Sequence, residues 1–155
     1  MICRLTAFSR MIGCHCRTET TILDAILGTR RSIREERQTV EKSYRLLERV
    51  GLAKEADEFA RNLSYGAQRR LEIARAMATD PFLLLLDEPA AGMNPQETHD
   101  LDELIVRIRA EDKLAILLIE HDMKLVMSIS DRIYVVEYGK EIAQGTPREI
   151  KENPR

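Results

Sequence analysis

A helical spacing of apolar residues dominates the first half of the chain. It begins near Thr20 and is clearest over residues 34–50, where apolar side chains recur every three or four positions. The side chains that define this stripe are Val40, Tyr44 and Leu47. Gly51 follows, and glycine often ends a helix because it accepts the left-handed conformation. Two shorter helices are predicted over 53–59 and 66–78.

After Pro81 the pattern changes to short apolar runs separated by amphipathic segments. The runs at 82–86 and 114–119 have no polar face, which is typical of strands covered on both sides in a parallel sheet. Between them the sequence predicts a helix, because Asn94 is a good N-cap and Pro95 a good first residue. The apolar stripe of this helix consists of Leu101, Leu104, Ile105 and Ile108.

The C-terminal section adds a helix over 123–129, a hairpin and a last helix. The hairpin strands are predicted at 132–137 and 141–144 around a turn at Gly139, and Pro147 opens the last helix. We interpret the order strand, helix, strand, helix, strand as two successive βαβ units. The predicted fold class is therefore α/β, with a partial parallel sheet covered by helices.

Composition and charge argue against two classes of partner. The chain has 24 Lys and Arg against 26 Asp and Glu, so its formal net charge of -2 gives no electrostatic reason to bind nucleic acid or an anionic membrane. Its longest apolar runs fall far short of the roughly 20 residues that span a bilayer. Arg4, Arg10 and Arg17 interrupt every apolar stretch near the N-terminus, so no signal-peptide core is predicted.

The three cysteines lie close together at one end of the chain. Their odd number and crowding exclude a disulfide framework. Cys14, His15 and Cys16 contain the right atoms for a soft metal ion, but they lack a fourth ligand and the usual spacing of zinc sites. Reduced thiols without a metal are the favoured interpretation.

The strongest chemical signal is the pair Asp87 and Glu88, which ends the first apolar strand. In open parallel α/β sheets, ligands bind outside the carboxyl ends of the strands. One carboxylate there can hold a magnesium ion through its water shell, while the other orients or deprotonates a water for phosphoryl transfer. The strand pattern alone is explained equally well by a solvated loop that follows a core strand.

Two further features favour a phosphate ligand. Ser64 and Gly66 open a helix, where a hydroxyl, accessible amides and the positive helix end can bind an anion, although an ordinary capped helix explains this segment better when it is taken alone. His121 ends the second apolar strand, so it is expected to project beside Asp87 and Glu88. A histidine there can donate a hydrogen bond to a phosphate oxygen.

Four segments in this order resemble the signature motif, Walker B, D-loop and H-loop of an ATP-binding cassette (ABC) ATPase. They are residues 63–68, 82–88, 91–94 and His121, and the resemblance covers about 20–155. Tyr65 replaces the glycine most often seen in the signature motif. Three longer segments further resemble the ATP-binding subunit of branched-chain amino-acid importers, namely residues 89–97, 119–123 and 138–147.

The resemblance implies a P-loop NTPase-like fold with two parts. Residues 19–80 would form the helical subdomain with the signature motif, and residues 81–155 a partial RecA-like α/β core, while residues 1–18 are atypical. It also implies ATP and Mg²⁺ as cofactors. The expected partners are a second ABC ATPase subunit and membrane permease subunits. The permease would hold the chain on the cytoplasmic, inner face of the cell membrane, and the helical subdomain would dock onto it.

The resemblance also implies a role for each matching residue. Asp87 would bind magnesium, Glu88 would be the catalytic base, and His121 would contact the γ-phosphate. The remaining nucleotide-binding positions would be Ser64, Gly66, Gln68 and Asn94. Ser64 and Gly66 would act on the ATP held by the partner subunit, and the turn at Asn94 would couple the two sites of the dimer.

Two motifs of the family are missing. A P-loop requires Gly-x-x-x-x-Gly-Lys-Ser/Thr, but only Gly139 precedes a lysine here, and Tyr134 stands where the first glycine belongs. The first glutamine, Gln38, lies within a predicted helix, so the Q-loop is absent too. We therefore expect a chain trimmed at both ends, with an unrelated N-terminus before Thr20, that neither binds nor hydrolyses ATP alone. Without its neighbour, the leucine-rich strand should have an unpaired edge, an uncovered flank and poor solubility.

Two alternatives remain open at this point. The chain could be a degenerate, non-catalytic half-partner that lends Ser64 and Gly66 to the ATP of an intact subunit. It could also be a non-transport ABC ATPase of DNA repair or translation. The near-neutral charge and the lack of a long heptad insertion weigh against this second alternative.

Overall fold

The first part of the structure is helical. The computed structural model describes residues 29–153, so the helix predicted near Thr20 and the Cys14-His15-Cys16 cluster lie outside the described residues. The elements of this part are helix α3 (Arg30–Arg49), the 3₁₀ turns η1 (Ala53–Glu55) and η2 (Ala60–Asn62), and helix α4 (Tyr65–Met77). The helices predicted over 34–50 and 66–78 are confirmed. The helix over 53–59 is wrong, because η1 buries no side chain that could stabilise a longer helix.

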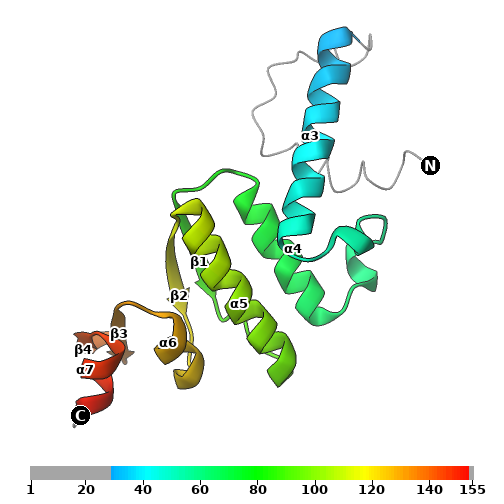
Figure 1. Cartoon of the computed structure of the whole chain (residues 1–155). Helices are drawn as coiled ribbons and strands as arrows, with labels where there is room; N and C mark the ends of the chain where they lie inside the picture. Colours follow the sequence, from blue (N-terminus) through cyan, green and yellow to red (C-terminus); the bar gives the residue numbers. More distant parts are fainter. Residues whose placement is uncertain (1–28, 154–155) are drawn as a thin grey trace.

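Within the described chain, helix α3 projects away from the other elements and meets α4 only near its C-terminal end (Figure 1). The α3 residues buried in this contact are Ser43, Leu46 and Leu47, and Val50 continues their face. Tyr44 is 46% exposed, so its predicted place on the apolar stripe is wrong. It follows Ser43 by one residue, which turns it about 100° away from the contact face. Gly51 has φ +74°, as expected for the residue that ends the helix.

The second part begins with a parallel βαβ unit. Strand β1 (Leu83–Asp87), helix α5 (Pro95–Asp112) and strand β2 (Ala115–Ile119) follow one another, and the two strands pair in parallel. The register places Asp87 opposite Ile119, so both strands end at the same edge. This unit confirms the predicted α/β class, and α5 has the predicted cap and buried stripe.

The second predicted βαβ unit does not form within residues 29–153. Helix α6 (Met123–Ile129) leads to strand β3 (Ile133–Glu137), which pairs with strand β4 (Lys140–Gly145) in a separate antiparallel sheet. The pairing is local, because Tyr138 and Gly139 both have positive φ and make the tight turn that hairpins favour. Helix α7 (Pro147–Glu152) closes the described chain, with Thr146 as its N-cap.

The main core lies on one side of the β1–β2 sheet. Leu84 and Leu86 point into it, where they join buried residues of α3, α4 and α5. None of the helices within residues 29–153 has the length and apolar character needed to cross a bilayer.

The other side of the same sheet is uncovered in the described chain. We define the open face as Leu83, Leu85, Leu117 and Ile119, which are 39%, 65%, 51% and 58% exposed. The prediction that these strands are covered on both sides is therefore wrong for the described residues, whereas the expected uncovered flank is confirmed. Phe82, the predicted first residue of the strand, lies before β1 and is 88% exposed.

Candidate functional site

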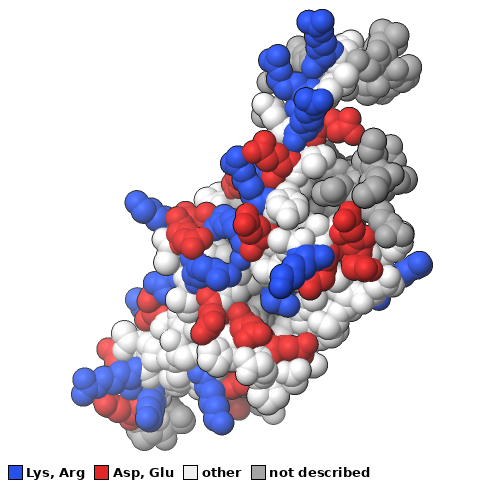
Figure 2. Space-filling model, turned by 45° about the vertical axis from the view of Figure 1, so that its right-hand side comes forward, with Lys and Arg blue, Asp and Glu red and all other residues white. Residues whose placement is uncertain are grey.

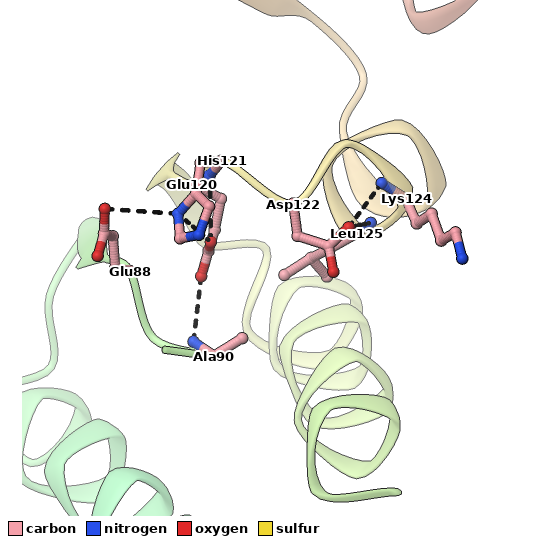
Figure 3. Close-up of polar contacts among 7 residues, drawn as sticks. All are labelled: Glu88, Ala90, Glu120, His121, Asp122, Lys124 and Leu125. Carbon is pink, nitrogen blue, oxygen red and sulfur yellow. Dashed lines mark hydrogen bonds and ion pairs between the residues drawn. The ribbon is translucent and has the colours of Figure 1, made fainter. Parts of the chain in front are cut away.

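The carboxyl edge of the β1–β2 sheet brings the three predicted chemical residues to one end of the fold. Asp87 is the last residue of β1, and the backbone N–H of Glu88 continues the ladder by donating to the Ile119 carbonyl at 2.9 Å. His121 faces Glu88 across this edge (Figure 3), with 3.5 Å between its Nδ1 and the Glu88 Oε1. Both side chains are largely exposed, so a solvent-borne ligand can reach them.

The loop after β1 is held in a tight path. Glu88 has φ +42°, which turns the chain out of the strand. Two turns follow, in which Ala91 donates to the Glu88 carbonyl and Met93 donates to the Ala90 carbonyl, each at 3.1 Å. Gly92 has φ +77°, a conformation that favours glycine. The carboxylate of Glu88 therefore sits on a short, hydrogen-bonded loop.

Sequence reasoning missed Glu120, the residue between β2 and His121. Its side chain is only 1% exposed. One carboxylate oxygen accepts the backbone N–H of Ala90 at 3.1 Å, and the other accepts the backbone N–H of His121 at 3.3 Å. The available signal was the alternation of β2, because a side chain that follows the exposed Ile119 is expected to point inward.

A second buried carboxylate lies close to this edge. Asp102 of α5 has one oxygen, Oδ1, that is buried and has no hydrogen-bond partner within residues 29–153. Burial raises the pKa of Asp102 above its ordinary value, His99 opposes this shift, and the negative charges of Asp122 and Glu120 add to it. Asp102 therefore adds a partly buried negative charge near Glu120 and Asp122.

The predicted anion-binding segment is a capped helix start. The Ser64 hydroxyl accepts the backbone N–H of Ala67 at 3.2 Å, and the Gln68 side chain donates to the Leu63 carbonyl at 3.0 Å. The capped-helix interpretation of Ser64 thus describes its observed contact. Binding of an anion here stays a prediction.

Gly66 and Asn94 meet through Glu97. A Cβ atom on Gly66 would lie 2.9 Å from the Glu97 Oε1, so this close contact gives a second reason for glycine. Glu97 and Asn94 form the capping box of α5, in which the Asn94 Oδ1 accepts the Glu97 N–H at 2.9 Å. The starts of α4 and α5 therefore lie side by side.

Tyr65 adds a second contact between these two segments. Its hydroxyl accepts from the Arg69 Nη2 at 2.7 Å, and its ring lies 3.4 Å from the position of a Cβ on Gly92. The structure thus gathers the predicted residues into two groups. One group is Asp87, Glu88 and His121, and the other is Ser64, Gly66, Gln68 and Asn94. Within residues 29–153 no hydrogen bond or ion pair joins the two groups directly.

The carboxylates suit a nucleotide-bound magnesium ion better than a metal held by protein alone. The described residues contain no group of three or more His, Cys, Asp or Glu side chains that could hold a metal ion. Mg²⁺ keeps several waters and typically takes one or two carboxylates together with phosphate oxygens. The exposed Asp87, at the end of β1, fits that donor set.

Comparisons with known proteins point to one family. A family model described as ABC transporter matches residues 10–91, a range that begins within the segment 1–18. The chain is 51% identical over 144 residues to the high-affinity branched-chain amino acid transport ATP-binding protein LivG of Salmonella typhimurium, and 49% identical to BraF of Pseudomonas aeruginosa. In both cases the match covers 93% of this chain and 56% of the relative, so the chain spans about half the length of these relatives.

Solved structures of ATP-binding cassettes superimpose on the chain, which again covers only part of each of them. The ADP conformation of MJ1267, an ATP-binding cassette of an ABC transporter, superimposes with a TM-score of 0.73 at 33% identity, covering 92% of this chain and 56% of that one. A nucleotide-free ATP-binding cassette from an ABC transporter gives 0.74 at 28% identity, covering 94% and 58%. The fold therefore corresponds to part of an ABC nucleotide-binding domain. From its sequence match and its fold, the chain belongs to the ABC transporter family.

Proposed function

We propose that this chain is the signature, Walker B, D-loop and H-loop section of an ATP-binding subunit that drives branched-chain amino-acid uptake. The observation that supports this most directly is the meeting of Glu88 and His121 at the carboxyl edge of the sheet, with 3.5 Å between Oε1 and Nδ1. The 51% identity to an ATP-binding protein for branched-chain amino acid transport supports the choice of solute class.

In this proposal the three edge residues divide the chemistry of ATP hydrolysis. Glu88 orients the attacking water and accepts its proton, and His121 donates a hydrogen bond to the γ-phosphate. Asp87 would hold Mg²⁺ through its water shell, and this ion would neutralise charge on the phosphates. Because Glu88 and His121 already lie side by side at this edge, a water held by the Glu88 carboxylate and a phosphate oxygen held by the imidazole would be brought close together.

The second group acts on the nucleotide of a partner subunit. Ser64 uses its oxygen to accept the Ala67 N–H, which leaves its O–H proton available for a phosphate oxygen. The positive end of α4 adds favourable electrostatics. Gln68 and Asn94 contribute to the same surface by fixing the Leu63 carbonyl and the start of α5.

The proposed partners follow from the family and from the surface. A second ATPase subunit would complete each nucleotide site, and permease subunits would hold the chain at the cytoplasmic side of the membrane. The projecting part of α3 offers an exposed surface for the permease. Lys and Arg lie among Asp and Glu on the face drawn in Figure 2, which supports a protein partner over nucleic acid.

A section swap tests the proposal. The part of Salmonella typhimurium LivG that matches this chain is replaced by the sequence of this chain, and ATP hydrolysis is measured with the permease subunits present. We expect turnover that falls by about 10²- to 10⁴-fold in Glu88→Gln, the usual range for a lost general base. Glu103→Gln, on an exposed position of α5, is the matched control and should keep full turnover. A swapped subunit that folds and binds its partners without hydrolysing ATP would contradict the proposal.

The capped start of α4, where the Ser64 O–H proton stays available for a phosphate oxygen, favours a second candidate, a non-catalytic half-partner that lends Ser64 and Gly66 to an intact subunit. This chain, added to an intact subunit that cannot dimerise, would then restore turnover, and Gly66→Asp would abolish the effect. Equilibrium dialysis with ATP separates both candidates from an independent enzyme, because micromolar binding by the chain alone contradicts both.

A further inference from the structure

We infer that Glu120 is a positioning residue that fixes the loop bearing Glu88 relative to the loop bearing His121. The inference rests on the proposed function of those two residues. Figure 3 shows the arrangement, in which the Glu120 side chain lies behind His121 and reaches across to Ala90. No other described carboxylate accepts backbone N–H groups from both of these loops.

The burial of Glu120 indicates that its two hydrogen bonds matter. A carboxylate that is 1% exposed has lost nearly all its water, which is costly unless other donors replace that water. Here two backbone N–H groups replace it, one on each oxygen. Hydrogen bonds to an ionised acceptor are roughly twice as strong as neutral ones. The carboxylate therefore ties two separate loops together.

The hydrogen bond to Ala90 also restricts the position of Glu88 in the first loop. Ala90 is two residues beyond Glu88, and the turns that close on the Glu88 and Ala90 carbonyls leave little slack between them. A change in the position of the Ala90 N–H would therefore move the Glu88 carboxylate.

The second loop is anchored on both sides of His121. Glu120 accepts the His121 backbone N–H, and the Asp122 side chain accepts the Lys124 N–H at 2.8 Å to start α6. The imidazole Nδ1 lies 3.5 Å from Glu88 and 3.8 Å from Glu120, so it faces both carboxylates. The contacts on both sides of His121 therefore hold the imidazole beside Glu88.

An amide side chain at position 120 cannot accept both hydrogen bonds. Glu120→Gln has the same shape, but only its carbonyl oxygen accepts, and its NH₂ group would point at the second backbone N–H. The variant therefore loses one of the two anchors. This makes it a sharper test than alanine, which would also leave a cavity.

The first experiment measures backbone hydrogen exchange in the full chain. In Glu120→Gln we expect either the Ala90 or the His121 amide to exchange about tenfold faster or more, depending on which N–H loses its acceptor, while the Leu104 amide in α5 is unchanged. Glu103→Gln should leave all three amides unchanged. Unaltered exchange at both Ala90 and His121 in a folded Glu120→Gln chain overturns the inference. If that variant does not fold, Glu120→Asp keeps the charge and is one methylene too short, and the same criterion applies to it.

The second experiment measures ATP hydrolysis in the swapped subunit described above. We expect Glu120→Gln to lower kcat per folded molecule on the order of ten- to a hundredfold, the effect of one hydrogen bond to a charged group, with KM for ATP unchanged. A merely structural role would reduce the folded fraction and leave kcat per folded molecule intact, and that result overturns the inference. If the parent swapped subunit is inactive, the proposed function fails, and exchange at Ala90 and His121 decides whether Glu120 anchors the two loops.

Discussion

The two faces of the β1–β2 sheet are both apolar, but one face is buried and the other is exposed. Leu84 and Leu86 are 4% and 8% exposed, whereas Leu83 and Leu85 are 39% and 65% exposed. These four consecutive leucines differ only in the side to which the strand alternation directs them. A run of apolar residues therefore shows how many faces of a strand are suited to burial. It does not show which segment of chain covers each face.

The open face also ends at the candidate site. Asp87 follows the same alternation as Leu83 and Leu85, so it stands at the carboxyl end of the uncovered side. Each strand of this sheet has a single neighbour within residues 29–153, which leaves both outer edges unpaired there. The apolar surface that would need covering and the carboxylate that would hold a metal ion thus belong to the same side of the sheet.

The largest expected effect comes from the covered face. Leu84→Ala should lower the free energy of unfolding by about 2–5 kcal/mol, because it removes buried contacts and leaves a cavity. Urea denaturation followed by circular dichroism measures the loss. Leu85→Ala, one residue further on the open face, is the matched control and should cost far less. Equal losses at the two positions would show that the difference between the faces is not real in solution.

The contact between the helices that cover this face gives the next effect. Gly66→Ala should cost about 1–2 kcal/mol, since its new Cβ would displace the Glu97 side chain from its place in the capping box. Thermal unfolding of Gly66→Ala in the wild-type and Glu97→Ala backgrounds measures the coupling. Most of the cost should disappear when Glu97 is alanine, and a cost that persists would place the clash elsewhere.

On the open face we expect a change in association with little change in stability. Leu85→Thr should alter the free energy of unfolding by no more than about 0.5 kcal/mol, as is usual for surface positions. It should also reduce self-association, because it interrupts the exposed apolar surface. Light scattering as a function of protein concentration measures this effect. A variant that associates as strongly as the wild type would mean that another surface is responsible.

The smallest effect concerns the pH dependence of the covered side. Because the pKa of Asp102 is raised, the folded chain binds this proton more tightly than the unfolded chain does. The free energy of unfolding therefore falls as pH rises from the ordinary carboxyl range through the raised pKa of Asp102. Asp102→Asn cannot lose a proton and should not show this fall. Its thermal midpoint relative to wild type should therefore rise between acidic and neutral pH. A constant difference would indicate that Asp102 titrates normally.

Local signals in the sequence predicted the helices and the order of the motifs well. Helix α5 was predicted closely because its cap, its first proline and its buried stripe are properties of the segment itself. The failures involve contacts between distant segments. Strand β3 pairs with β4 across a hairpin turn instead of joining the β1–β2 sheet, and the sequence of β3 alone does not show which of the two pairings forms. The exposure of Tyr44 depends on which face of α3 meets α4.

In the candidate site, too, local signals predicted some residues and contacts between distant segments determined others. Asp87, Glu88 and His121 were predicted because parallel strands end at a common edge. Glu120 was not predicted, because its importance comes from Ala90, a residue thirty positions earlier in the chain. Strand alternation alone could have shown that Glu120 points inward, but not which N–H groups it would find there.

The capping box of α5 has a consequence for natural variation in this chain. The Glu97 carboxylate accepts the backbone N–H of Asn94 at the start of α5 and also fills the space next to Gly66. One side chain therefore contacts the first turns of both α4 and α5. Replacement of Glu97 by a shorter residue would free room at position 66 while unwinding the start of α5. Tolerated changes at positions 66, 94 and 97 should therefore arise together, as a matched set, and seldom one at a time.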